Sequence, residues 1–200
     1  MAENDLPISS DTTPHRTFLQ NLGFHFVDFF QTLVVFGAIF SAIYLFVAQP
    51  HKVSGNSMLP TFHNGDYILT DKLSYRFGQP KRGDVIVLKN PRDESQDFIK
   101  RIIGTTGDSV MVNSGRVYTN GQLQIENFLP PGVYTNTGNF LSESQAAKID
   151  DGQFIVMGDN REHSSDSREW GFVKTSEIIG KVFLRYWPPQ AFGLYHDPKY

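Results

Sequence analysis

A long run without charge limits this chain more than any other feature. From Phe29 to Pro50 the sequence reads FFQTLVVFGAIFSAIYLFVAQP and contains no Asp, Glu, Lys or Arg. A helix needs about 20 mostly apolar residues to cross the hydrocarbon layer of a membrane. Aromatic residues lie toward both ends of the run, where a spanning helix meets the interface; they are Phe29, Phe30, Tyr44 and Phe46. We therefore expect a single transmembrane helix over 26–50.

A buried helix and a cleaved signal peptide both fit this run less well. A buried helix could also be apolar, but helices of globular proteins are rarely apolar on every side. A cleaved signal peptide would have a shorter apolar region and a small-residue cleavage site, whereas this run is followed by Gln49, Pro50 and His51. An uncleaved anchor fits the run best.

Residues 1–25 precede this anchor. The first twenty are polar and include Pro7, Pro14 and several Ser and Thr, so we predict a disordered tail. Positive charge near a span sets its orientation, but Arg16 and Lys52 are the only Lys or Arg close to either end. The charges therefore leave the sidedness open.

Beyond the anchor, residues 51–200 have the composition of one mostly antiparallel β domain. Short runs rich in Val, Ile, Tyr and Phe are bounded by turn residues, and Asn120-Gly121 is a typical two-residue hairpin turn. We expect one short helix around Ser142–Lys148. The candidate strands are Tyr67–Thr70, Val85–Leu88, Phe98–Ile103, Ser109–Asn113, Val117–Tyr118, Phe154–Met157 and Val182–Tyr186.

Composition excludes several classes of function. The 200 residues contain no cysteine, which excludes thiol catalysis, cysteine-ligated zinc and disulfides. The net charge of −3, without a block of Lys or Arg, argues against nucleic-acid binding. The carboxylates and His163 fit no zinc or calcium spacing, so we expect neither a metal nor another cofactor.

A possible nucleophile lies just after the anchor, in the stretch Ser54-Gly55-Asn56-Ser57-Met58-Leu59-Pro60-Thr61. Gly55 permits unusual backbone angles and Pro60 stiffens the end of the loop. The loop could hold Ser57 exposed, with its N–H free to bind an oxyanion. Taken alone, these residues are equally consistent with an ordinary turn between anchor and domain.

A serine nucleophile needs a base, and Lys100 is the unusual candidate. It lies in the apolar run Phe98–Ile103, where burial would lower the pKa of a lysine. Arg101 beside it cannot lose its proton. The alternative is an edge-strand lysine whose amine reaches solvent. The histidines that could replace it are expected in polar loops; they are His51, His63 and His163.

A third segment, GDNREHSSDSREWG over 158–171, is too polar for a simple turn. Its acidic and basic side chains could pair and brace the loop; they are Asp159, Arg161, Asp166 and Arg168. Ser164 or Ser165 could hydrogen-bond a neutral lysine and hold it in position.

Together, these segments resemble bacterial type I signal peptidases, which are Ser-Lys proteases of exported proteins. The match runs from about residue 30 to about 187, and no single motif would be specific. It includes SGNSMLPT (54–61), GDVIVL (83–88), FIKRIIGTTGD (98–108) and GDNREHSSDSREWGFV (158–173).

The resemblance implies a role for each matching residue. Ser57 is the nucleophile and the oxyanion donor through its N–H, Lys100 is the general base, and Ser164 orients the lysine. Gly55 stands where some members have a second oxyanion hydroxyl, so that donor would be a backbone group or Ser54. Met58, Phe98 and Ile99 are expected at the substrate groove. Structural roles are expected for Asp159, Asp166 and Arg168.

The implied function is removal of N-terminal signal peptides from preproteins, after small residues at positions −1 and −3. The tail would be cytoplasmic and the peptidase domain extracytoplasmic, with membrane lipid and preproteins as partners. The short region 109–157 implies a small second β subdomain.

Three rivals remain open. A self-cleaving Ser-Lys regulator of the DNA-damage response would lack the membrane span. A peptidase dedicated to one secretion, pilus or conjugation substrate would share every motif. The presence of both Ser57 and Lys100 argues against a catalytically inactive anchored homologue or binding module, and a measurement of activity decides that case. The eukaryotic type of signal peptidase has a histidine where Lys100 stands, which makes that subclass a poor match.

Overall fold

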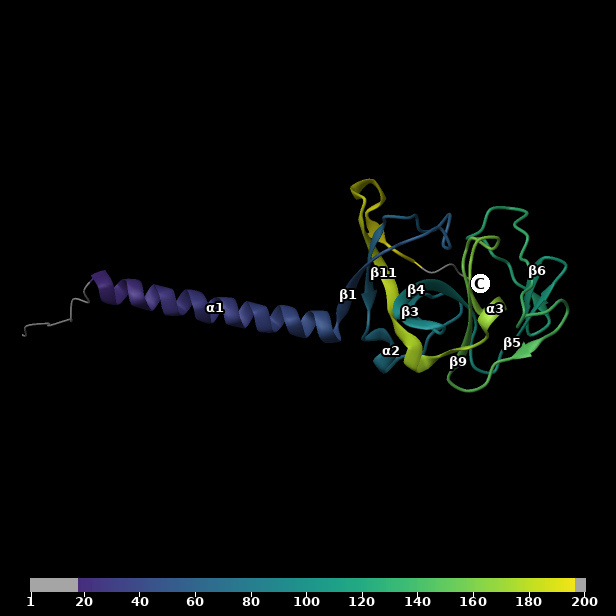
Figure 1. Cartoon of the computed structure of the whole chain (residues 1–200), viewed down its shortest axis with the longest axis horizontal. Helices are drawn as coiled ribbons and strands as arrows, with labels where there is room; N and C mark the ends of the chain where they lie inside the picture. Colours follow the sequence, from purple (N-terminus) through teal and green to yellow (C-terminus); the bar gives the residue numbers. More distant parts are fainter. Residues whose placement is uncertain (1–17, 197–200) are drawn as a thin grey trace, which may run out of the picture. The chain divides into compact units, whose positions relative to one another are not determined.

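The computed structural model describes residues 18–196, with side chains from residue 25 onward. Most of the expected tail, residues 1–17, lies outside the described residues. The chain divides into two units, one that ends at Ala42 and one that begins at Ile43 (Figure 1).

Helix α1 spans Phe18–Phe46. Its stretch His25–Phe46 has a mean hydropathy of 2.0 and is long enough to cross a membrane. The helix ends before the expected boundary at residue 50, because Ala48–Lys52 forms strand β1. Pro50 lies in β1, at the edge of a sheet. Proline has no N–H for a helix interior but is tolerated in an edge strand.

The second unit is built on a large antiparallel sheet of eight strands (Figure 1). The strand order is β1-β2-β11-β3-β4-β9-β10, and β12 pairs with β11. Neighbouring strands pair antiparallel throughout. Besides β1, the strands are β2 (Tyr67–Asp71), β3 (Val85–Asn90), β4 (Asp93–Gly104), β9 (Gln153–Met157), β10 (Val173–Lys174), β11 (Ile178–Trp187) and β12 (Gly193–Leu194).

A smaller antiparallel sheet has four strands in the order β7-β6-β5-β8. Asn120 and Gly121 have φ of 54° and 76°, as a two-residue hairpin turn requires, and they join β6 to β7. The mostly antiparallel β fold with one N-terminal apolar helix is therefore confirmed. The strands are β5 (Ser109–Asn113), β6 (Arg116–Thr119), β7 (Gln122–Leu123) and β8 (Ala147–Lys148).

The helix expected around Ser142–Lys148 is wrong. Ser144 has φ of 58°, which a helix cannot contain, and its N–H donates to the carbonyl of Val112. Ala147 and Lys148 pair with β5 instead. The helical segments of the second unit are short; they are α2 (Ser74–Phe77), α3 (Ser167–Trp170) and the 3₁₀ turns Thr175–Glu177 and Pro189–Ala191.

One apolar cluster fixes the loop between β1 and β2 to the large sheet. Met58 and Phe62, both 1% exposed, come from this loop. They belong to a buried cluster with strand residues that include Ile68, Val87 and Val182. Burying a side chain of this size stabilises a fold by about 1.5–3 kcal/mol, so these two side chains attach the loop to the sheet.

Candidate active site

Ser57 lies in the loop between β1 and β2, half-buried beside the buried Met58. Two residues earlier, Gly55 has φ of 94°, a left-handed conformation that glycine adopts without strain. The N–H of Gly55 donates to Asn64 Oδ1 at 3.0 Å. The tight turn at Gly55 and the buried side chain of Met58 together fix where Ser57 stands.

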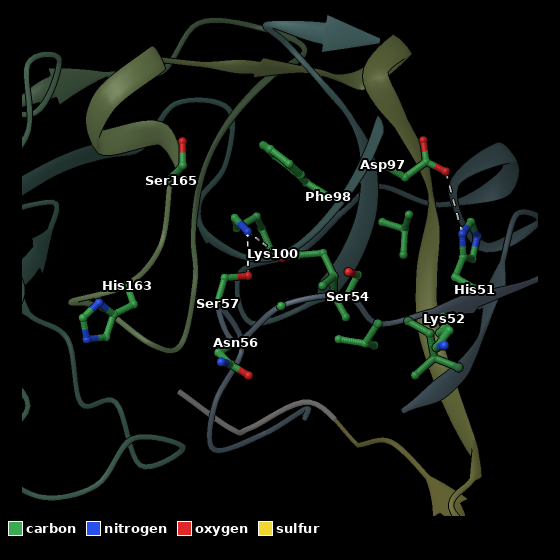
Figure 2. A pocket seen from close by; sticks show the side chains of 15 residues that line it. His51, Lys52, Ser54, Asn56, Ser57, Asp97, Phe98, Lys100, His163 and Ser165 are labelled. Carbon is green, nitrogen blue, oxygen red and sulfur yellow. Dashed lines mark hydrogen bonds and ion pairs between the residues drawn. The ribbon is translucent and has the colours of Figure 1, made fainter. Parts of the chain in front are cut away.

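Lys100 comes from β4 and is only 3% exposed. Its Nζ lies 2.9 Å from Ser57 Oγ and 3.0 Å from the carbonyl oxygen of Ile99. The ring of Phe98 is 5.0 Å from the same nitrogen. Figure 2 shows the amine of Lys100 pointing toward Ser57. The structure thus brings together the two side chains that the sequence separates by 43 positions.

Burial lowers the pKa of Lys100 to about 8, against the opposing influence of Asp166 and Asp159 and with a smaller contribution from Arg168. A charged amine loses hydration when it is buried, which favours the neutral form. A neutral amine has two N–H groups and one lone pair. It can therefore donate to the Ile99 carbonyl and accept the hydroxyl proton of Ser57.

A cavity of about 340 Å³ opens beside this pair. One wall comes from β1 and the loop after it, and the other comes from β4 (Figure 2). Phe98 and Ile99 line it as expected from the sequence. Its other lining residues are His51, Lys52, Val53, Ser54, Gly55, Asn56, Ser57, Ile68, Val87, Asp97, Lys100, His163 and Ser165.

One strand edge is open beside the cavity. β4 pairs with β3 through residues 97–101, but it pairs with β9 only from Arg101 to Gly104. Among the described strands, residues 97–100 of β4 thus have no partner on that side. An extended peptide can add to such an edge through main-chain hydrogen bonds.

The polar segment after β9 is braced, although only one ion pair forms inside it. Arg168 pairs with Asp166 at 2.8 Å. Asp159 instead holds Arg101 of β4 at 2.8 and 2.6 Å, and Arg161 holds Glu126 at 2.5 Å. These partners are distant in sequence, which is why charge spacing alone predicted pairing within the segment.

The same segment also holds the serine loop. The N–H of Asn160 donates to the Ser57 carbonyl at 3.0 Å, and its side chain donates to the Asn56 carbonyl at 3.0 Å. A Cβ on Gly158 would lie 2.4 Å from the Ser57 carbonyl oxygen, so no other residue fits there without a shift. Gly158 and Asn160 belong to the polar motif over 158–171, but their place in that motif predicted no role for them. Only the fold shows that they touch Ser57.

Three expected site residues lie differently. Ser164 makes no hydrogen bond to Lys100; among the described residues its buried Oγ has no partner, and it sits against Gly158. Gly55 cannot give its N–H to an oxyanion while Asn64 accepts it. Met58 packs in the core rather than lining the groove, because the loop turns its side chain inward.

Histidines and acids do not gather into a metal site. Within residues 25–196, no group of three or more His, Asp or Glu side chains could hold a metal ion. The cavity has at one end the hydroxyl of Ser57 beside the amine of Lys100, whose pKa burial lowers.

Comparison with known proteins gives a consistent result. The family model "Signal peptidase, peptidase S26" matches residues 26–187. "Probable signal peptidase I-2" of Synechocystis sp. is 37% identical over 94% of this chain and 81% of its own length. "Probable signal peptidase I-1" of the same organism is 42% identical over 74% and 76%. "Signal peptidase I" of Bacillus caldolyticus is 37% identical over 78% and 88%.

Proposed function

Because the chain belongs to the signal peptidase family, peptidase S26, and is a signal peptidase enzyme, we propose that it cleaves preproteins with a Ser57–Lys100 dyad. The observation that carries this proposal is the 2.9 Å separation of Lys100 Nζ from Ser57 Oγ, with the lysine 3% exposed. A serine hydroxyl is a weak nucleophile until a neighbouring base removes its proton.

In the first step, neutral Lys100 takes the proton of Ser57 as Oγ attacks the carbonyl carbon after the −1 residue. The resulting ammonium of Lys100 gives that proton to the leaving amine, and an acyl-enzyme on Ser57 remains. A water molecule then attacks the ester as Lys100 takes its proton. Lys100 returns that proton to Ser57 Oγ as the bond between Oγ and the acyl carbon breaks, which releases the signal peptide with a free carboxyl end. The Ile99 carbonyl accepts a hydrogen bond from the amine and holds it toward Ser57 throughout.

The negative charge that forms on the attacked oxygen needs donors. We assign the N–H of Ser57 as one donor, because no hydrogen bond from it is made to the described residues. Ser54 lines the same cavity and supplies the second donor through its hydroxyl. The side chain of Asn160 donates to the Asn56 carbonyl, which belongs to the same planar peptide group as the Ser57 N–H and so fixes the direction of that N–H.

The substrate binds as an extended strand against the open edge of β4 at residues 97–100. The cavity beneath it has an apolar floor that includes Val53, Ile68 and Val87. Such a groove accepts small side chains at the alternate positions −1 and −3, which point to the same side of an extended peptide.

We also propose that His25–Phe46 of α1 crosses the cell membrane, with the N-terminus cytoplasmic and the peptidase domain outside. Anchoring in the substrate's own membrane raises its effective concentration. The absence of cysteine makes this testable in cells with single-cysteine variants and a membrane-impermeant maleimide. Glu94→Cys should be labelled in intact cells and Ser9→Cys only after lysis; the reverse pattern would overturn the sidedness.

The decisive experiment is cleavage of several unrelated preproteins by the detergent-solubilised chain, beside Ser57→Ala. The expected product is cut after a small residue and is absent with Ser57→Ala. Ser95→Ala, an exposed serine of β4, is the matched control and should cleave normally. Cleavage of only one preprotein would favour a dedicated peptidase, and none from a folded wild-type chain would favour an inactive homologue.

A further inference from the structure

The end of the cavity away from Ser57 is polar. His51 of β1 and Asp97 of β4 face each other there, with 3.8 Å between His51 Nδ1 and Asp97 Oδ2 (Figure 2). The His51 side chain is 12% exposed and that of Asp97 is 40% exposed. The floor of the cavity is apolar and includes Val53, Ile68 and Val87. Lys52, Ser54 and Asn56 are further polar residues of its lining.

The hydrogen bonds of Thr70 determine which nitrogen of His51 carries the proton. The Thr70 hydroxyl donates to the Gln49 carbonyl at 3.1 Å. It therefore has no proton left for His51 Nε2, 3.2 Å away, and must accept from that nitrogen. The neutral ring consequently has its proton on Nε2, and Nδ1 presents a lone pair toward Asp97.

His51 is neutral near pH 7. Burial lowers its pKa, which Asp97 opposes and Lys72 supports. The Nδ1 lone pair and the Asp97 carboxylate are then two acceptors that face each other without a proton between them. Such a pair is satisfied by a hydrogen-bond donor placed beside it.

The register of an extended substrate brings one side chain to this place. Two residues of a strand span about 6.6 Å, and their side chains share a face. With the −1 carbonyl at Ser57, the next side chain on that face is that of residue −3, which enters the cavity between β1 and β4. Both side chains therefore enter the same cavity of about 340 Å³.

We propose that His51 and Asp97 make the −3 subsite selective for a small residue that carries a hydroxyl, threonine or serine, over an apolar residue of the same shape. This inference rests on the proposed function and adds a substrate preference to it. The hydroxyl of residue −3 donates to the acceptors at the end of the cavity, while the apolar floor that includes Val53 and Val87 limits its size.

The test uses four peptides that share a cleavage site with Ala at −1 and differ only at −3, which is Ala, Val, Thr or Leu. Thr and Val have nearly the same shape, so their ratio of kcat/KM isolates the hydroxyl. A net hydrogen bond of ordinary strength predicts a Thr:Val ratio of about 5. Leu should be the poorest of the four.

Two variants test whether His51 and Asp97 cause the preference for Thr over Val. His51→Phe keeps a ring but removes the acceptor, and Asp97→Asn replaces a carboxylate by an amide of the same size; each should lower the Thr:Val ratio toward 1. Asp93→Asn, whose carboxylate bonds Ser95 and Gln96 elsewhere on β4, should leave the ratio unchanged.

The Ala peptide separates the two proposals. If the wild-type chain cuts it and the Thr:Val ratio is 1, the subsite proposal fails and the proposed function stands. A raised ratio that neither His51→Phe nor Asp97→Asn changes also overturns the assignment. If no peptide or preprotein is cut, the proposed function itself fails.

Discussion

Lys100 and Arg101 are neighbours on β4, both buried, and the fold treats their charges in opposite ways. Arg101 is 0% exposed and makes two hydrogen bonds to the carboxylate of Asp159. Its pKa is raised, because Asp159 and Tyr195 outweigh the effect of burial. Lys100 has a hydroxyl and a carbonyl oxygen as its hydrogen-bond partners instead, and its pKa falls to about 8.

The difference shows what a buried cation needs. A carboxylate in contact with a buried cation compensates for the lost hydration and keeps the cation charged. The Arg101–Asp159 pair can therefore link β4 to the segment after β9. Neutral partners do not compensate, so the lysine can release its proton near neutral pH. The strand alternation sends the two side chains to opposite faces, where these surroundings differ.

The largest expected effect concerns the lysine. Lys100→Met should lower kcat/KM by about 10³-fold or more, because general-base catalysis contributes about 10²–10⁴, while the circular dichroism spectrum stays native. Lys89→Met, on the exposed face of β3, should have normal activity. Normal activity of Lys100→Met would remove Lys100 from the mechanism.

Arg101→Met should instead act on stability. It leaves Asp159 buried without its cation, which is expected to lower the free energy of unfolding by about 3–5 kcal/mol. Urea denaturation of the detergent-solubilised chain measures this. Arg92→Met, at an exposed position, should change the free energy of unfolding by less than about 0.5 kcal/mol. An equally small effect of Arg101→Met would show that the Arg101–Asp159 pair does not stabilise the fold.

Lys100→Met should raise the free energy of unfolding, by about 2 kcal/mol at pH 7. In the wild type, the lowering of the Lys100 pKa from 10.5 to about 8 means that burying the charged amine destabilises the folded state by about 3 kcal/mol. The substitution removes this cost, but it also removes a hydrogen bond that stabilises the folded state by about 1 kcal/mol. Between pH 8 and 10.5 the unfolded chain binds more protons than the folded one, so wild-type stability rises with pH there. The advantage of the variant should therefore shrink across that window, and an advantage independent of pH would have another cause.

The smallest expected effect is on the pH profile. At pH 7 about one tenth of the Lys100 side chains are neutral if the pKa is about 8. The kcat/KM for a peptide without titrating groups should therefore rise about tenfold per pH unit below about 8 and level off above it. A profile that is flat from about pH 6 to 9 would contradict a titrating base.

Much of this molecule follows from local pattern. The uncharged run, the alternation of apolar residues and the Asn120-Gly121 turn give an apolar helix and an antiparallel β domain, because each depends on neighbours in sequence. Pairings across the fold were not predictable in the same way. Asp159 pairs with Arg101, Arg161 pairs with Glu126, and strand pairing with β5 replaces the helix expected near Ser144.

The sequence by itself determined that a serine in a glycine turn and a lysine in an apolar strand were present on a chain with an apolar helix. Only the tertiary structure decided that Lys100 stands 2.9 Å from Ser57, that Met58 faces the core, and that His51 meets Asp97. The physical reason is that distance, burial and hydration are set by side chains from strands far apart in sequence. A pKa near 8 for Lys100 is a property of that packing, not of the strand that carries the residue.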